Sequence, residues 1–160
     1  MHSSLRSCRR LATASAIFLL GVLLLATPAR ADVDLGGRAG AYTDEGRAFF
    51  GAELLTPLES THSWYVNPNF EYAFEDSSDL MTLNGDFHYD LATEGRYAVW
   101  FGGGPALLFL DRELGDDETD LGMNLLAGFG AKRGEARPYF QAKVIVADDP
   151  TAVLGVGVRF

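Results

Sequence analysis

Hydrophobic and polar residues alternate one by one along most of the chain after Ala31. A period of two is typical of β-strands with two different faces, because successive side chains of a strand point to opposite sides of its sheet. Clusters of Gly, Pro, Asp and Ser interrupt the alternation at regular intervals, as turns between strands do. The pattern predicts one all-β domain with eight strands, at 33–43, 47–58, 64–75, 79–91, 96–110, 119–132, 136–147 and 151–160.

The two faces of these strands differ sharply in polarity. One face is apolar and often aromatic, as Trp64, Val66, Phe70 and Tyr72 illustrate, and no charge interrupts it between strand ends. Glycine fills much of the opposite face. Its polar residues are Arg38, Glu53, Asn67, Asn69, Glu71, Asn84, Asp86, His88, Asn124, Gln141, Lys143 and Arg159.

Alternation alone leaves open which face points inward. A soluble periplasmic barrel of the lipocalin kind would turn the apolar face inward and bind an apolar ligand there. Three features favour the inverse, membrane-spanning arrangement. Each strand is close to the ~9–11 residues that a tilted strand needs to cross a bilayer. The glycine-rich polar face suits a narrow lumen, and aromatic residues recur near strand ends on the apolar face, as an interfacial girdle requires.

The first 31 residues have the three parts of a secretory signal peptide. Arg6, Arg9 and Arg10 precede the apolar run 16–26, and the small-residue site Ala29-Arg30-Ala31 follows it. This order predicts export with cleavage after Ala31 and a barrel domain at 32–160. All 22 acidic residues but only nine of the 13 basic ones follow Ala31, so the exported part would carry a net charge of −13. Such a charge argues against nucleic acid as a partner.

The export signal, the eight amphipathic strands and the final "VGVRF" resemble the small outer-membrane β-barrel proteins of the OmpA/OmpX type. The resemblance implies an eight-stranded antiparallel up-and-down transmembrane barrel in the bacterial outer membrane, surrounded by lipid and lipopolysaccharide. It also implies that Phe160, with Val156 and Val158 before it, is the signal read by the outer-membrane assembly machinery. A monomer without cofactors is expected. Fold resemblance identifies architecture better than activity.

The predicted lumen contains Arg38, Glu53, Glu71, Asp86, His88 and Lys143. An eight-stranded barrel is just wide enough for its side chains, and buried charges have to be paired. We therefore expect a salt-bridged plug and a structural, envelope-maintaining role. The alternative is a narrow, low-conductance channel that forms when these pairs rearrange.

Other candidate chemistry is weaker. In "DFHYD", Asp86, His88 and Asp90 share one face, but side chains two positions apart stand about 7 Å apart along a strand. A hydrogen-bonded lumen histidine is expected there rather than a metal site. The neighbouring His62 and Ser63 lie in a predicted turn, and no Ser or Cys lies on a predicted inward face, so we expect no enzyme.

Two further features leave questions open. The acidic run Asp116-Asp117-Glu118, with Asp120, is typical of a solvated outer loop, with binding of divalent cations as the alternative. Pro68 and Pro105 fall inside predicted strands, where each removes a ladder donor. We expect a bulge at these positions, or a strand broken near Gly103.

Overall fold

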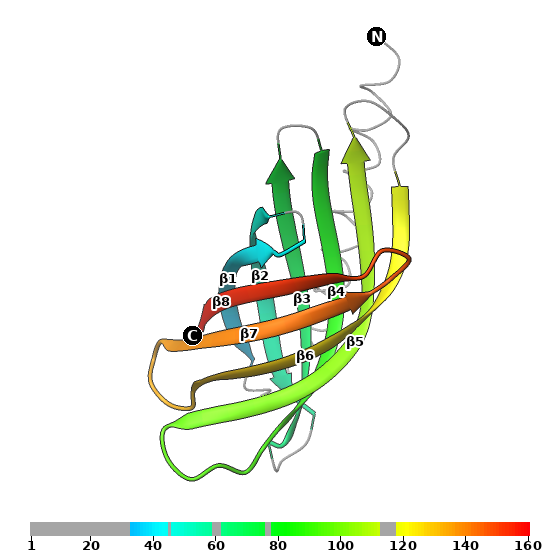
Figure 1. The fold of residues 1–160 in the computed structure, drawn as a ribbon. Coiled ribbons are helices and arrows are strands. Elements are labelled where there is room, and N and C mark those ends of the chain that lie inside the picture. The colour runs from blue at the N-terminus through cyan, green and yellow to red at the C-terminus, as the bar shows by residue number, and fades with distance from the viewer. Residues whose placement is uncertain (1–32, 45, 59–61, 76–77, 113–117) are drawn as a thin grey trace. The chain divides into compact units, whose positions relative to one another are not determined.

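The computed structural model describes residues 33–44, 46–58, 62–75, 78–112 and 118–160 (Figure 1), so the predicted signal peptide and residues 113–117 of the acidic loop lie outside the described residues. The eight strands are β1 (Asp34–Tyr42), β2 (Arg47–Pro57), β3 (Trp64–Glu75), β4 (Ser78–Asp90), β5 (Tyr97–Arg112), β6 (Glu118–Ala131), β7 (Arg137–Val146) and β8 (Thr151–Arg159). They confirm the predicted strands, mostly to within one or two residues.

The strands form a closed antiparallel barrel in chain order. β1 pairs with β2 on one side and with β8 on the other, where the register runs from Gly36 opposite Arg159 to Tyr42 opposite Val153. The last strand is therefore hydrogen-bonded on both edges, and the predicted up-and-down topology is confirmed. Among the described residues, no helix is long and apolar enough to cross a membrane.

The apolar face of the barrel points outward. Burial alternates along every strand, and β6 from Leu121 to Gly130 is exposed and buried at successive positions throughout. Large exposed side chains are mostly apolar, including Phe50, Trp64, Phe74, Phe101, Leu121, Met123, Leu125, Phe129, Val156 and Phe160. This arrangement is the reverse of a soluble barrel with an apolar interior.

The expectation of a bulge or break at the two prolines was wrong. On both sides of Pro68, β2 and β3 keep the same register, from Glu53 opposite Asn69 to Thr56 opposite Val66. The side-chain amide of Asn67 donates to the carbonyl oxygen of Leu54 at 2.7 Å, supplying a donor beside the proline that lacks one.

At Pro105, β5 is likewise continuous, and the register between β4 and β5 is the same at Asn84–Ala106 and at Phe87–Gly103. The pyrrolidine ring points outward and lies over Gly85, whose missing side chain leaves room for it. Each proline therefore interrupts the ladder pairing on one side of its strand without inserting a residue.

Candidate functional site in the barrel lumen

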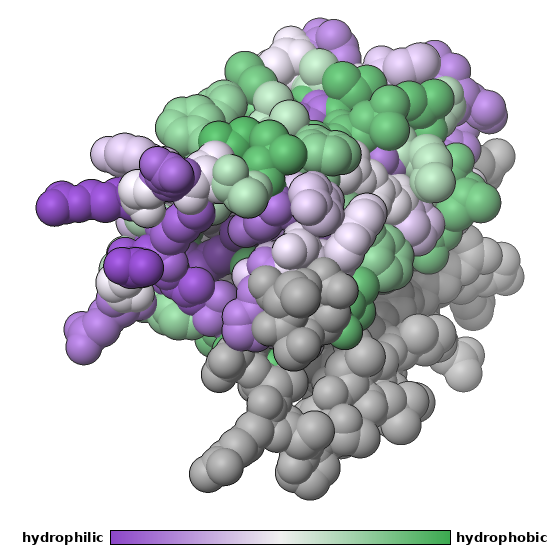
Figure 2. All heavy atoms as spheres, turned by 90° about the horizontal axis from the view of Figure 1, so that it is seen from below, coloured by the Kyte–Doolittle hydropathy of each residue, from purple (hydrophilic) through white to green (hydrophobic). Residues whose placement is uncertain are grey.

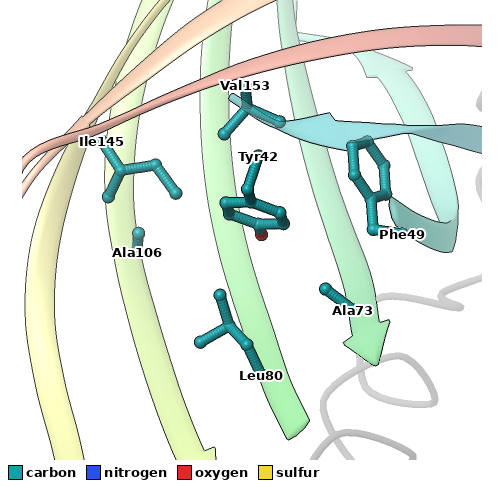
Figure 3. Close-up of a cluster of buried hydrophobic side chains, with 7 residues drawn as sticks. All are labelled: Tyr42, Phe49, Ala73, Leu80, Ala106, Ile145 and Val153. Atoms are coloured by element: carbon teal, nitrogen blue, oxygen red, sulfur yellow. The ribbon is translucent and has the colours of Figure 1, made fainter. Parts of the chain in front are cut away.

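Side chains fill the lumen in layers along the barrel. The end that contains the β1–β2 and β7–β8 turns is closed by an apolar layer, in which Tyr42 packs with Phe49 at a ring-centroid distance of 5.6 Å. Figure 3 shows these side chains pointing toward one another from different strands. The layer consists of Tyr42, Phe49, Ala73, Leu80, Ala106, Ile145 and Val153. These inward apolar residues lie on the face that the sequence pattern marks as polar.

The Glu71 cluster lies next to this layer. Glu71, on β3, is fully buried, and the ammonium group of Lys143 donates to both of its carboxylate oxygens at 2.9 Å. Nη2 of Arg38 lies 3.0 Å from Oε1, and the hydroxyl groups of Tyr42 and Thr82 donate to Oε2 at 2.8 and 3.2 Å. One anion is thus held by two cations and two hydroxyl groups from three other strands, β1, β4 and β7.

A second anion, Glu53 on β2, connects this cluster to the opposite end of the barrel. Nε of Arg159 donates to Oε1 of Glu53 at 2.8 Å, and the side-chain amide of Asn67 donates to Oε2 at 3.2 Å. Nη1 of Arg38 lies 3.7 Å from the same Oε2. Arg38 therefore bridges Glu53 and Glu71. Pairing of this kind is what we expected of charged groups in the lumen.

Asp86 is held mainly by amides. The side-chain amides of Asn124 and Asn69 donate to its two carboxylate oxygens at 2.7 and 2.8 Å. The amide of Asn84 in turn donates to Asn69, and that of Asn124 also donates to Asn84. The carboxylate thus accepts hydrogen bonds from two other strands, β3 and β6, and Asn84 on its own strand joins the network.

His88 differs from the expected hydrogen-bonded histidine. Its ring packs edge-on against Tyr65 and Trp100, and its buried Nε2 atom has no hydrogen-bond partner within the described part of the chain. No group of three His, Cys, Asp or Glu residues there could hold a metal ion, so Asp86, His88 and Asp90 are not assembled into such a site.

An aromatic layer lies toward the end that contains the β6–β7 turn. The guanidinium group of Arg159 lies over Tyr139 and Trp100, at 4.2 and 5.0 Å from the ring centroids. Trp100 donates to Gln141 at 3.3 Å, and Ala98 and Leu126 pack beside the two rings. The charged middle of the lumen is therefore bounded by an apolar layer on one side and an aromatic layer on the other.

Sequence reasoning placed the lumen charges on the correct face but missed several of their partners. Tyr42, Thr82, Trp100 and Tyr139 all occupy inward positions of the same two-residue alternation. Each of them lies an even number of positions from a polar residue or a glycine of the inward face on its own strand, as Tyr139 does from Gln141. This spacing would have identified them as inward-facing. It could not show that Tyr42 reaches Glu71, because that contact depends on how the strands are staggered round the barrel.

Comparison with known proteins supports the fold. No protein-family model matches the sequence, and no curated protein matches it. Solved structures that match include Neisserial surface protein A, with a TM-score of 0.59 at 13% identity, covering 79% of this chain and 92% of the other. The outer membrane enzyme PagL matches with a TM-score of 0.51 at 13% identity, covering 79% and 98%. Ail, the attachment invasion locus protein of Yersinia pestis, matches with a TM-score of 0.50 at 15% identity, covering 81% and 97%.

At these identities the likeness concerns the fold. The three structures are small eight-stranded outer-membrane β-barrels, and both the strand number and the closed antiparallel topology agree with them. The expected resemblance is confirmed at this level: the chain has the fold of the small transmembrane β-barrels of the OmpA/OmpX type.

Proposed function

We propose that this protein is an integral outer-membrane β-barrel with a closed polar lumen, and that its role is to maintain the cell envelope rather than to catalyse a reaction. The observation that carries the proposal is the polarity of the wall, which is apolar outside and charged inside. A surface of this extent would be unfavourable in water, whereas hydrocarbon accepts it and requires a closed sheet.

The aromatic residues near the β6–β7 end support insertion in a membrane. Trp64 packs against Tyr89 with ring centroids 5.1 Å apart, and Tyr97 and Phe160 are 66% and 67% exposed. Tryptophan and tyrosine are favoured at the membrane–water boundary, because their rings are apolar and each carries a polar group. We assign these residues to one interfacial girdle.

The pairing of the lumen charges supports a plug over a channel. Moving an ion through the lumen would require Glu71 to exchange Lys143 and Arg38 for water or for other partners. Each of these groups is buried, so breaking one pair without a replacement is costly. The alternative function is a narrow, low-conductance channel, and measuring conductance distinguishes the two.

The lack of catalysis is part of the proposal. The fold is compatible with an enzyme, since PagL is described as one. Here the described serines are Ser63, in the β2–β3 turn, and Ser78, at the first position of β4, and the lumen charges of the central layer are already paired with one another. We propose no metal, cofactor or nucleic-acid partner.

Export and assembly complete the proposal. We propose that residues 1–31 are a signal peptide cleaved after Ala31, and that Val156, Val158 and Phe160 are recognised by the outer-membrane assembly machinery. Val156 and Phe160 are exposed on the outer face of β8 and beyond its end, where another protein could contact them during insertion. The folded protein would be a monomer in contact with lipid and lipopolysaccharide.

Two measurements test the proposal. Washed outer membranes are run on SDS gels with and without boiling, and a band that shifts on boiling is expected for a closed, detergent-resistant barrel. An unshifted protein in the periplasmic fraction would contradict membrane insertion. The purified barrel is then reconstituted in planar bilayers, where we expect no steady conductance. A conductance that changes in Glu53→Gln or Lys143→Met, but not in Glu94→Gln in the exposed β4–β5 turn, would establish the channel instead.

A further inference from the structure

A cavity of about 400 Å³ opens at the β6–β7 end of the barrel. We call it the vestibule. Its walls come from the starts of β1, β3, β5 and β7, the ends of β2, β4, β6 and β8, and the turns between them. Its inner part includes Trp100, Tyr139 and Arg159. Seen from below in Figure 2, hydrophilic residues gather on the left, the side on which Figure 1 places the β6–β7 turn. The vestibule is within the ~300–1,000 Å³ of typical small-molecule sites.

The vestibule is lined by more cations than anions, although the sequence as a whole carries a net charge of −9. Lys132, Arg133, Arg137 and Arg159 face two carboxylates, those of Asp34 and Asp90. Nη2 of Arg137 forms an ion pair with Asp34 at 2.5 Å, which neutralises one of each sign. Arg159 is also paired, with Glu53 behind the lining, so that Lys132 and Arg133 remain against Asp90. This excess of one positive charge favours an anion.

Arg159 supplies an unused donor within this lining. The residue is 6% exposed, and Nε is bound to Glu53, but its buried Nη2 atom has no hydrogen-bond partner among the described residues. Leaving such a group unpaired is costly. A guanidinium nitrogen without a partner is also well suited to a carboxylate or phosphate, whose oxygens accept charge-assisted N–H bonds.

The body of a ligand would meet rings and one acceptor. Trp100 and Tyr139 are nearly buried and already lie against Arg159, whereas the ring of Tyr65 is half-buried. Such a ring packs well against other rings or short apolar groups. Oδ1 of Asp90, which is buried and without a partner in the described residues, could accept a hydrogen bond from a hydroxyl group of the ligand. The lining thus combines a hydrogen-bond donor for an anion, a flat aromatic surface and a separate hydrogen-bond acceptor.

We propose that the vestibule is a binding site for a small organic anion, a carboxylate or phosphate carried on a ring or a short apolar body. The anionic group would bind Arg159 at the inner wall and Arg133 at the rim, and the body would lie against the half-buried ring of Tyr65. The site faces away from the apolar layer and does not require an open lumen, so it goes beyond the structural role proposed above.

The experiment uses folded, purified barrel in an uncharged detergent. Phenyl phosphate, benzoate and inorganic phosphate are each titrated by calorimetry. We expect saturable one-site binding of phenyl phosphate or benzoate and weaker binding of inorganic phosphate, since only the first two offer a ring. The stronger of the two organic probes identifies the anionic group. No saturable binding of either, or equal affinity for all three anions, would overturn the proposal.

Variants locate the site. Arg159→Lys keeps a charge beside Glu53 but removes the second nitrogen, and we expect at least about tenfold weaker binding, typical of a lost charge-assisted hydrogen bond. Arg133→Gln is expected to weaken binding about threefold, because its side chain is exposed at the rim. Arg96→Gln is the matched control: it removes an exposed charge at the same end that does not line the vestibule.

Arg96→Gln should bind as the unaltered protein does. Equal weakening in Arg96→Gln and Arg133→Gln would indicate general attraction of anions and would overturn the site. If Arg159→Lys does not give a heat-modifiable barrel, the double variant Lys132→Gln/Arg133→Gln is used to test the site. Both residues lie outside the strands, so we expect this variant to fold. Unchanged binding in that variant would also overturn the proposal.

Discussion

The Glu71 cluster and the vestibule side of the lumen both contain buried polar side chains, but they differ in how many of these groups have hydrogen-bond partners. Around Glu71, both carboxylate oxygens are bound, and the two cations Lys143 and Arg38 and the hydroxyl group of Tyr42 all point at them. On the vestibule side, Nε2 of His88, Nε2 of Gln141 and Nη2 of Arg159 are buried without a hydrogen-bond partner in the part of the chain that the structure describes. Nε and Nη1 of Arg38 are also without one among these residues, so the contrast concerns the Glu71 carboxylate itself.

This difference separates two uses of buried polarity. A carboxylate whose two oxygens are both bound stiffens a protein, because each bound group limits the movement of the next. A group left unpaired is a cost in the empty barrel that a ligand or water can relieve. We infer that the Glu71 cluster holds the barrel closed, whereas the vestibule side is adapted to exchange partners.

The largest expected effect comes from Glu71→Gln. The substitution keeps the shape of the side chain but leaves Lys143 and Arg38 without their shared anion. Removing one partner of a buried ion pair costs about 3–5 kcal/mol. Urea unfolding in lipid vesicles, followed by tryptophan fluorescence, should show this loss. Glu94→Gln in the exposed β4–β5 turn is the control, and an equally small change in both variants would mean that the cluster does not stabilise the barrel.

Pairing can be tested by removing both members of one ion pair. In Glu71→Gln/Lys143→Met, the cation that lost its anion is also gone, so the double variant should lose less than the sum of the two single ones. We expect a coupling of about 1–3 kcal/mol, as found for residues in direct contact. A double-mutant cycle on unfolding free energies measures it. Strictly additive losses would show that the two groups act independently.

Replacing a glycine by alanine in each region compares how tightly the two regions are packed, because the added Cβ costs more stability where its neighbours cannot move. An added Cβ at Gly51, beside Glu71, would lie 2.1 Å from the backbone oxygen of Phe70, whereas at Gly128 it would meet a side chain, the ring of Trp100, at 2.5 Å. Gly51→Ala should therefore cost about 1–3 kcal/mol and Gly128→Ala about 1 kcal/mol.

The control for this pair is Gly37→Ala. A Cβ added at Gly37, on the outer face, has no neighbour within 4 Å. Because alanine loses less backbone entropy than glycine on folding, this variant should be neutral or slightly stabilised. Midpoints of urea unfolding rank the three variants, and a larger loss in Gly128→Ala than in Gly51→Ala would reverse the comparison.

The smallest effect is expected at His88. Its Nε2 makes no hydrogen bond to the described residues, so His88→Leu should change the unfolding free energy by less than about 1 kcal/mol and could raise it. Asn69→Leu at a comparable burial should cost more, because it removes a donor from Asp86. Equal losses in the two variants would indicate that His88 is hydrogen-bonded in solution.

The strands and their two faces could be predicted from the sequence because both follow from local rules. The two-residue period assigns each side chain to a face, and turn residues limit each strand, so the bounds of β2 and β3 were predicted almost to the residue. The apolar outer face and the glycine-rich inner face then favoured a membrane barrel over a soluble one. The inward positions of Glu53, Glu71 and Lys143 follow from the same counting.

The partners of these residues depended on the tertiary structure. Lys143 and Glu71 are 72 residues apart and lie on strands that are not neighbours, so only closure of the barrel and the stagger of its strands bring them within 2.9 Å. The prolines are similar: a missing donor is visible in the sequence, but the amide of Asn67 that serves Leu54 is not. Local periodicity determined which way each side chain points, whereas the three-dimensional register decided which group it meets and which, such as Nη2 of Arg159, meets none.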